Sequence, residues 1–312
     1  MEARLSAVRE PMRTAPVALF VYNRPLHTRQ TVEALLANDL VAQSDLFVFS
    51  DGAKSPQSAE AVAAVRAYVR SIRGFRSINV HERTQNAGLS ASIIEGVTTL
   101  CEQYGRAIVL EDDLVTSPQF LSYMNQALLM YENDTQVASI HGYCWQASER
   151  LPETFFLRGA DCWGWATWAR AWRHFEPDGE KLLRLLIERG LDRAFDLDGA
   201  YAFTQMLRDQ IAGRKDSWAV RWHASCFVES RFTLYPGRSL VENIGNDASG
   251  THCQVTADFS TRLSDRPIQL RRIDIESSEL ARHSFAKFLR GTRRSRIHRI
   301  FTRVMKQTGF FQ

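Results

Sequence analysis

The first 110 residues alternate between short apolar runs and longer segments with apolar positions at helical spacing. Four apolar runs have the length of buried strands: 17–22, 46–49, 78–80 and 107–110. Three segments between them repeat apolar residues every three or four positions, as one face of a helix requires: 28–36, 59–72 and 90–104. Alternating strands and helices of this kind predict a parallel sheet covered by helices on both faces.

Polar or acidic residues follow three of these strands directly. The clusters are Asn23-Arg24, Ser50-Asp51-Gly52 and Glu111-Asp112-Asp113. In open parallel α/β sheets, ligands bind beyond the carboxyl ends of the strands. We therefore expect the three clusters to converge on one cleft.

The acidic cluster places three carboxylates next to one another at a strand exit. Like charges at such a point repel, so a fold keeps them most readily when a cation or a set of donors neutralises them. Side chains alternate along an extended chain, which puts Glu111 and Asp113 on one side and Asp112 on the other. Mg²⁺ or Mn²⁺ prefers such oxygen ligands, often one or two carboxylates together with substrate phosphates. The alternative is a solvated acidic loop.

The residues around this cluster resemble a known family. Residues 108–114, with 117–121 and Tyr123, resemble the acidic motif and following helix of GT-A glycosyltransferases, closest to the mannoside N-acetylglucosaminyltransferase branch and to bacterial family 2-like enzymes. Residues 18–25 and 48–52 are similar to the first two strands and nucleotide loops of that family. The resemblance covers residues 15 to 145 and fades after them.

The resemblance implies a GT-A, Rossmann-like fold with a mixed, mainly parallel sheet flanked by helices and a C-terminal acceptor-side half. It also implies an inverting, metal-dependent hexosyl or N-acetylhexosaminyl transfer from a uridine diphosphate sugar to a glycan or lipid-linked glycan. Asn23 and Arg24 would then meet the nucleotide. Glu111 and Asp112 would contact the donor, and Asp113 would bind Mn²⁺ or Mg²⁺.

Two loop residues are further donor-site candidates. Asp51 corresponds to the aspartate that reads the uracil in the family, and a carboxylate beside glycine at a strand end can accept from a base N–H or a ribose hydroxyl. Its alternative is an ordinary Asp-Gly turn. Asn86 begins a loop similar to the one that many such transferases place near the donor, but Asn86 or Ser90 can equally cap a helix.

The segment Cys162 to Trp168 resembles the aromatic Gly-Trp segment of the same branch. Gly164 between Trp163 and Trp165 indicates close backbone approach, which makes Trp165 a candidate contact of the donor sugar. Core packing is the alternative for any of these tryptophans.

An inverting transfer needs one carboxylate to accept the proton of the attacking hydroxyl. The candidate is Asp216, in a segment that looks like the family's Asp-Trp-x-x-Arg sequence but has one extra residue between Asp216 and Trp218. Asp196 and Asp198 are rivals, and a surface aspartate paired with Lys215 is the alternative. Downstream, the polar loop 243–252 ends in His252, a candidate second metal ligand or a solvated loop histidine.

Charge and cysteine content bear on location. The chain carries a net charge of +4, yet residues 282–312 contain nine Lys or Arg and no Asp or Glu. Apolar residues at helical spacing make this tail a predicted basic amphipathic helix, which suits an anionic membrane surface. The five cysteines are widely spaced and form no C-x-x-C pair, so they favour buried thiols. Without an apparent signal or spanning segment, we expect a bacterial-type cytoplasmic enzyme at the inner face of the membrane, building a surface polysaccharide or a lipid-linked glycan.

These observations predict a division of the chain into four segments. They also bear on two alternative function classes. The predicted segments are an N-terminal extension, a nucleotide-sugar half, an acceptor-binding half and a basic tail: 1–14, 15–136, 137–270 and 271–312. A sugar-phosphate nucleotidyltransferase would need a glycine-rich phosphate loop after the first strand, and Phe20 to Thr31 contains no glycine. A non-enzymatic membrane- or nucleic-acid-binding module led by the tail would leave the carboxylates at the strand ends unexplained.

Overall fold

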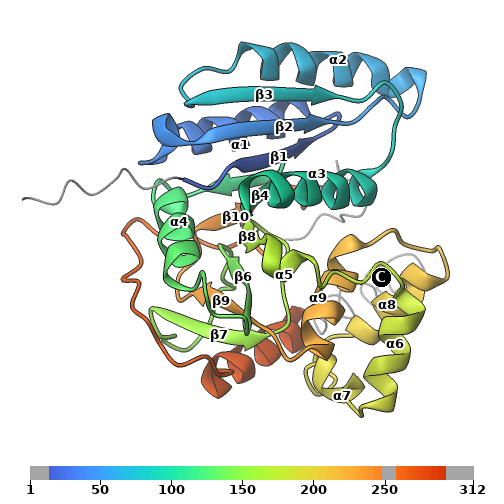
Figure 1. Cartoon of the computed structure of the whole chain (residues 1–312), viewed down its shortest axis with the longest axis vertical. Helices are drawn as coiled ribbons and strands as arrows, with labels where there is room; N and C mark the ends of the chain where they lie inside the picture. Colours follow the sequence, from blue (N-terminus) through green and yellow to red (C-terminus); the bar gives the residue numbers. More distant parts are fainter. Residues whose placement is uncertain (1–13, 248–257, 293–312) are drawn as a thin grey trace, which may run out of the picture.

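The computed structural model describes residues 14–247 and 258–292, which form a mixed sheet flanked by helices (Figure 1). Eight strands run in the order β3-β2-β1-β4-β8-β6-β9-β7. Their bounds are β1 Val17–Val21, β2 Asp45–Ser50, β3 Ser77–Glu82, β4 Arg106–Glu111, β6 Val137–His141, β7 Thr154–Arg158, β8 Trp165–Trp168 and β9 Phe232–Pro236.

Six of the eight strands run in the same direction. Strands β3, β2, β1 and β4 pair in parallel, β8 is antiparallel to both β4 and β6, β9 is parallel to β6, and β7 is antiparallel to β9. This is the mixed, mainly parallel sheet that the sequence predicts. The chain order reverses between β1 and β4, the place where open α/β sheets leave a crevice for a ligand.

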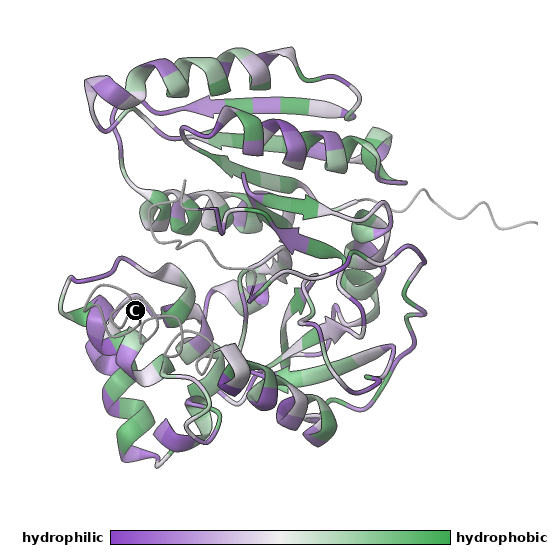
Figure 2. Cartoon of the chain, turned by 180° about the vertical axis from the view of Figure 1, so that it is seen from behind, coloured by the Kyte–Doolittle hydropathy of each residue, from purple (hydrophilic) through white to green (hydrophobic). Residues whose placement is uncertain are grey.

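The first three helices connect the parallel strands. They are α1 Pro25–Leu36, α2 Pro56–Ser71 and α3 Leu89–Tyr104. Right-handed crossovers place α1 and α2 on one face and α3, which returns the chain to β4, on the other. Hydrophobic residues predominate on the central strands, while the helices alternate between hydrophobic and hydrophilic residues along their length (Figure 2). The predicted strands and helices of this half are confirmed, with ends within a few residues.

The second half extends the same sheet and adds a helical cluster. Its helices are α4 Phe120–Met130, α5 Ala169–Trp172, α6 Gly179–Glu188, α7 Asp192–Phe195, α8 Phe203–Ile211 and α9 Trp218–Val228, and a 3₁₀ turn in the first half spans Val41–Gln43. Helices α6, α7, α8 and α9 enclose a small core of their own. The main core is continuous across both halves, because β8 from the second half pairs with β4 from the first.

A separate two-stranded sheet links the halves a second time. Strand β5, Leu114–Thr116, follows the acidic cluster directly and pairs antiparallel with β10, Val241–Asn243. Ile244 then donates a backbone hydrogen bond of 2.9 Å to the carbonyl of Asp113. The polar loop that begins at Asn243 is thereby held beside the acidic cluster, although the two are far apart in the sequence.

The basic tail begins as a helix over 279–292 that packs against the protein body. Phe285 stacks on Trp145 with ring centroids 4.5 Å apart, and Leu289 is buried. The first part of the predicted membrane-binding face is therefore used internally, which corrects that expectation for these residues. Residues 293–312 lie outside the described part of the chain. Within the described part, no helix combines the length and apolarity that crossing a bilayer requires.

Candidate functional site

A cavity of about 430 Å³ lies beyond the carboxyl ends of β1, β2 and β4. It brings together eight of the ten residues that the sequence singles out: Asn23, Arg24, Asp51, Asn86, Glu111, Asp112, Asp113 and Asp216. The register of the sheet explains this convergence, because Phe20 of β1 lies opposite both Phe49 of β2 and Glu111 of β4. The predicted cleft at the strand ends is present.

Arg24 is the cation at the acidic cluster. Its Nη2 atom bonds to the carboxylates of both Asp112 and Asp113, at 2.9 Å in the case of Asp113 Oδ2. All three side chains are largely buried. Burial opposes the charge of the guanidinium, but the two neighbouring carboxylates raise the pKa of Arg24 above its usual value. The arginine after β1 and the carboxylates after β4 thus stabilise one another across adjacent strands.

Glu111 is destabilised in its charged form. Burial, with repulsion from Asp113 and Asp112, raises its pKa to about 8, although Arg24 acts in the opposite direction. Burial also raises the pKa of Asp112, to about 6, against the opposing effect of Arg24. One guanidinium therefore does not neutralise the whole cluster, and further positive charge entering the cavity would be bound favourably.

Asp51 organises the loop that precedes α3. Its Oδ1 accepts from the backbone N–H groups of Gly52 (2.8 Å) and Ala87 (2.9 Å), and its Oδ2 accepts from Asn86 Nδ2 and the Gly88 N–H, both at 2.9 Å. A carboxylate has about four acceptor positions. The four donors occupy them, so in this structure Asp51 shapes the cavity wall through the loop, and its direct bond to a base stays a prediction.

The same loop requires glycine at two positions. Gly88, the N-cap of α3, has φ +83°, a conformation that side chains disfavour. At Gly52, an added Cβ atom would lie 2.4 Å from the carbonyl carbon of Gln85. The two glycines let the second and third strand-end loops approach closely, and they direct the N-terminus of α3 into the cavity, where Gly88, Leu89 and Ser92 form part of the wall.

Asp216 reaches the same cavity from the second half. It precedes α9, and its Oδ1 lies 3.7 Å from Nη2 of Arg221. Arg221 is buried and donates to Ser90 Oγ on α3 at 2.7 Å and to the Pro177 carbonyl at 3.3 Å. Arg221 therefore joins α9 to α3 and keeps Asp216 at the cavity, while the Asp216 side chain remains 64% exposed.

The two rival carboxylates lie elsewhere. Asp196 Oδ1 accepts from the backbone N–H and the hydroxyl of Thr204, in the first turn of α8, at 2.6 and 2.8 Å. Asp198 pairs with Arg282 of the C-terminal helix at 2.7 Å. Neither lines the cavity, so the position of a catalytic base remains with Asp216 among the three candidates.

Trp165 does not reach the cavity. It is 0% exposed and packs against three other indoles, stacking on Trp218 with a centroid distance of 5.4 Å. The strand alternation of β8 turns its ring toward α9, which covers that face of the sheet. The expected contact between Trp165 and a donor sugar is therefore wrong in this structure. Trp163, two residues earlier, lines the cavity instead.

Lys54 and Asn243 line the cavity, although the sequence pattern did not single them out. Lys54 lines the cavity, and its backbone N–H donates to the Tyr22 hydroxyl at 3.1 Å. Its position just after the Asp51-Gly52 turn is the sequence feature that could have identified Lys54. Asn243 reaches the cavity through the pairing of β10 with β5, which no local pattern indicates. His252 lies outside the described residues.

The carboxylate oxygens are ligands that a hard divalent cation prefers, but Arg24 determines how a cation could reach them. Among residues 14–247 and 258–292, no group of three or more His, Cys, Asp or Glu side chains is gathered to hold a metal. The space between Asp112 and Asp113 holds Arg24, so a cation would bind Asp113 only in exchange for its bond to that arginine. Such an exchange is compatible with a cation site made of one or two carboxylates and substrate phosphates, because the phosphates supply the remaining oxygen ligands.

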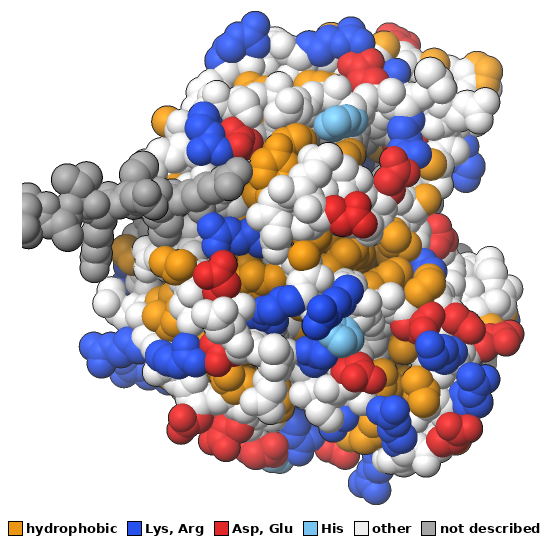
Figure 3. Space-filling model, viewed as in Figure 1, with side chains coloured by type: hydrophobic (Ala, Val, Ile, Leu, Met, Phe, Trp, Pro, Cys, Tyr) orange, Lys and Arg blue, Asp and Glu red, His pale blue; other side chains and the backbone are white. Residues whose placement is uncertain are grey.

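The distribution of charge argues against a nucleic-acid surface on the face shown in Figure 3. Basic and acidic side chains are mixed over that face, and hydrophobic side chains gather across its middle. Nucleic-acid sites instead carry a stripe or patch of one sign.

Comparison with known proteins identifies distant structural similarities. No known family model matches the sequence. The mannosyltransferase PcManGT from Pyrobaculum calidifontis, solved in complex with GDP-Man and Mn²⁺, is 12% identical, with a TM-score of 0.40 over 72% of this chain and 73% of that chain. TarS from S. aureus is 10% identical, with a TM-score of 0.39 over 74% of this chain, and the match spans only 37% of TarS.

Proposed function

We propose that the protein is an inverting glycosyltransferase that moves a sugar from a nucleotide diphosphate donor, a uridine diphosphate sugar, to a glycan or lipid-linked glycan acceptor. The observation that carries the proposal is the convergence, in one cavity, of the strand-end loops of β1, β2 and β4 with Asp216 of the second half. The sequence resemblance to GT-A transferases supports the same reaction and the choice of a uridine nucleotide.

The diphosphate would lie where the cavity offers positive charge. Arg24 lies between the carboxylates of Asp112 and Asp113, and the first turn of α3, with the positive end of the helix dipole, lines the same cavity. Lys54 supplies a second cation on the same wall. An incoming diphosphate would compete with Asp112 and Asp113 for Arg24, which frees Asp113 for a cation.

A divalent cation, Mn²⁺ or Mg²⁺, would be held by Asp113 and the donor phosphates and would offset the negative charge of the departing nucleotide diphosphate. Glu111, with its raised pKa, is neutral or charged according to the occupancy of the cavity, and a bound cation would favour its charged form. Asp112 keeps Arg24 in place.

Asp216 would accept the proton of the acceptor hydroxyl as its oxygen bonds to the anomeric carbon. The bond from that carbon to the diphosphate breaks on the opposite side, so the configuration inverts. Arg221 holds Asp216 without a tight ion pair, since 3.7 Å separates the two groups. The Asp216 carboxylate, 64% exposed, therefore stays accessible to an acceptor.

A thermal-shift panel tests the proposal. The protein would be heated with UDP-glucose, UDP-N-acetylglucosamine, UDP-galactose and GDP-mannose, with and without Mn²⁺, and then assayed for release of nucleotide diphosphate. We expect one donor to stabilise the protein by several degrees in the presence of Mn²⁺, and to be hydrolysed slowly. Absence of stabilisation and of hydrolysis with every donor would overturn the proposal. Release of pyrophosphate from UTP and a sugar 1-phosphate would instead identify a nucleotidyltransferase.

The Arg24→Met variant tests the exchange between arginine and metal. Without the guanidinium, Asp112 and Asp113 lack their counter-ion, so Mn²⁺ should bind and stabilise this variant without any nucleotide. In the wild-type protein, Mn²⁺ should bind detectably only with the diphosphate. Calorimetric titration of Mn²⁺ into both proteins makes the comparison, and equal binding in the two would contradict the exchange.

A further inference from the structure

We infer that the open edge of strand β3 pairs with β3 of a second copy of this chain, so that the two sheets join in a two-fold symmetric dimer. Strand β3 lies at one end of the eight-stranded sheet and β7 at the other (Figure 1). Within residues 14–247 and 258–292, β2 is the only strand that pairs with β3. An unpaired edge presents a row of backbone donors and acceptors to another strand. No residue of β3 lines the candidate active-site cavity, so the inference is independent of the proposed transferase function.

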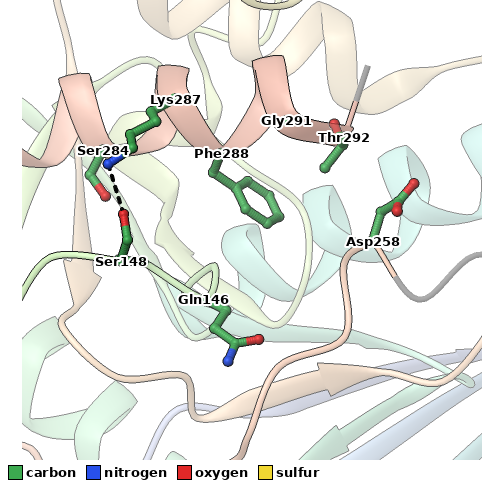
Figure 4. Close-up of a pocket in the computed structure, with 9 residues that line it drawn as sticks. Gln146, Ser148, Asp258, Ser284, Lys287, Phe288, Gly291 and Thr292 are labelled. Atoms are coloured by element: carbon green, nitrogen blue, oxygen red, sulfur yellow. Dashed lines mark hydrogen bonds between the residues drawn. The ribbon is translucent and has the colours of Figure 1, made fainter. Parts of the chain in front are cut away.

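The opposite edge of the sheet, strand β7, is covered by the chain itself. Phe156 of β7 forms an isolated parallel bridge with Ser277, and its carbonyl accepts from the Ser278 N–H at 2.9 Å. The C-terminal helix that follows is held in part by Lys287, which donates to Ser148 Oγ at 3.0 Å (Figure 4). No segment of the described chain forms such a bridge with β3 on the side away from β2.

Strand β3 lacks the features that protect exposed edges. Proline, lysine and β-bulges are common means of preventing another strand from pairing. Residues 77–82 contain no proline or lysine, and their pairing with β2 runs without a shift in register. Ile78 and Val80 are half-buried and alternate with exposed residues. A strand of this kind can pair along its whole length.

The hydrogen bonds to β2 show which backbone groups of β3 face the open edge. Arg83, directly after β3, donates its backbone N–H to the Ser50 carbonyl at 3.0 Å. Along a parallel strand, every second residue bonds to the same neighbour. The odd-numbered residues of β3 therefore bond to β2, and the even-numbered residues, Ile78, Val80 and Glu82, direct their N–H and C=O groups to the open edge.

An antiparallel pair centred on Asn79 matches β3 with itself. Ile78 then lies opposite Val80 of the partner subunit in a hydrogen-bonded pair, and Arg76 lies opposite Glu82 of the partner subunit. Apolar pairs and pairs of opposite charge are the combinations that stabilise antiparallel strands. A pair centred on Ile78 would instead place Arg76 opposite Val80 of the partner subunit. Charge complementarity thus selects the register centred on Asn79.

A groove beside the open edge accommodates the side chains of the second copy. It has a volume of about 520 Å³ and lies between the C-terminal end of α2 and β3. Val69 and Ile72 border it on the α2 side, and Ile78 and Val80 border it on the β3 side. Residues opposite each other in an antiparallel pair project to the same face. Ile78 and Val80 of the partner subunit would therefore extend this apolar wall and leave water.

The charged residues at the ends of the pair are bonded within each chain. Arg70 donates to both carboxylate oxygens of Glu82, at 2.8 and 2.6 Å, and Arg76 forms a two-point ion pair with Asp45. In the dimer, each of these ion pairs would lie beside the other pair of the partner subunit, with unlike charges adjacent. Association therefore buries no isolated charge.

Sedimentation velocity on the full chain is the first test. One short strand from each copy buries less area than a standard interface of roughly 1,200–2,000 Å², so we expect a dimer with a Kd on the order of 10 µM. Between about 1 and about 200 µM, the mass should rise from that of a monomer toward twice that value. A monomer at every concentration would overturn the inference and leave the edge to a strand of a different protein.

A cysteine at the two-fold axis tests the register. The two copies of Asn79 would lie in a pair that is not hydrogen-bonded, with Cα atoms about 4.5 Å apart, within the span of a disulfide. Asn79→Cys should therefore form a covalent dimer with oxidised glutathione, seen on non-reducing gels. The controls are the wild-type protein and Ser77→Cys, whose two copies would lie roughly 13 Å apart. Both positions are exposed, so both variants should fold. Equal cross-linking of Asn79→Cys and Ser77→Cys would overturn the pairing.

A like-charge variant tests the same contact without a covalent bond. In Asn79→Lys, two ammonium groups would face each other at the axis, so the Kd of the dimer should rise about fivefold. Gln126→Lys, at an exposed position on α4, is the control with the same change in charge. Antiparallel pairing directs the two active-site cavities toward opposite ends of the joined sheet, so stabilisation by donor should be unchanged in both variants. Equal Kd values in the two variants would contradict the dimer.

Discussion

At the scale of single residues, the site depends on carboxylates with different surroundings. Glu111 is buried beside two other carboxylates, Asp51 is saturated with donors, and Asp216 is exposed beside one distant arginine. The same functional group therefore occurs as a buried carboxyl with a raised pKa, as a structural hydrogen-bond acceptor and as an accessible carboxylate, which we propose as the base. The sequence shows the acids but not these surroundings.

Replacing Asp216 with Asn should lower kcat by about 10² to 10⁴-fold and leave the donor KM unchanged, because the amide cannot accept the acceptor proton. Steady-state kinetics with a donor identified by thermal shift would measure this effect. Asp196→Asn is the matched control, since Asp196 bonds to Thr204 in the first turn of α8, away from the cavity, and its loss should change stability alone. An equal loss of kcat in a folded Asp196→Asn protein would move the base to that residue.

Replacing Glu111 with Gln should change how stability depends on pH. The pKa of Glu111 is about 8 in the folded protein, above its usual 4.5, so the folded state holds a proton that the unfolded state releases between these values. The contribution of this group to the free energy of unfolding therefore falls as pH rises from about 4.5 to about 8.

The Glu111→Gln variant lacks this titration, so it should match the wild type near pH 4 and exceed its stability at pH 9 by on the order of 5 kcal/mol, because each pKa unit corresponds to about 1.4 kcal/mol. Denaturant unfolding across this pH range, without metal or nucleotide, provides the measurement. Glu60→Gln, at an exposed position on α2, is the control. An unchanged pH profile in Glu111→Gln would show that Glu111 is charged in the folded protein.

At the scale of elements, local periodicity was enough for the first half and not for the second. Strands β1 to β4 and helices α1 to α3 follow from apolar spacing, because each helix covers the sheet with one face. The antiparallel placement of β8 between β4 and β6 depends on long-range pairing, which spacing does not encode. Because that pairing turns Trp165 toward the core, the sequence pattern wrongly predicted it as a contact of the donor sugar. The strand-end clusters depend only on local strand order and were predicted correctly.

The loop before α3 makes a prediction at this scale. Asp51→Ala removes four hydrogen bonds to the loop and should destabilise the protein by about 2–4 kcal/mol. The unsupported loop should also weaken donor binding, even though Asp51 itself has no free acceptor position. Denaturant unfolding and thermal shift with donor would measure the two effects, with Asp39→Ala, at an exposed position, as control. Wild-type stability with lost donor binding would indicate direct contact with the nucleotide.

At the scale of the whole molecule, the C-terminal helix 279–292 packs against the surface of the second half. Arg282 pairs with Asp198 at 2.7 Å, Lys287 pairs with Glu149, and Phe285 and Leu289 pack inward. Hydrophobic residues at helical spacing predicted the helix correctly. They could not show whether its apolar face meets a lipid or the protein, because both are apolar partners.

Two truncations distinguish these roles. Deletion of 279–312 exposes Trp145 and removes the buried face of the helix, so it should lower the melting temperature by on the order of 10 °C. Deletion of 293–312 retains the described helix and removes six Lys or Arg residues. If the basic tail binds membranes, this shorter deletion should abolish sedimentation with vesicles containing phosphatidylserine while donor hydrolysis continues. Equal sedimentation of both proteins would exclude that role for 293–312.

The double connection between the halves restricts how substrates enter. Backbone ladders join β4 to β8 and β5 to β10, and both lie beside the acidic cluster. A clamshell opening would have to break these ladders, so the two halves should behave as one rigid unit during turnover. Any opening that admits the substrates proposed above would then be confined to the surface loops around the cavity, without a hinge motion between the halves.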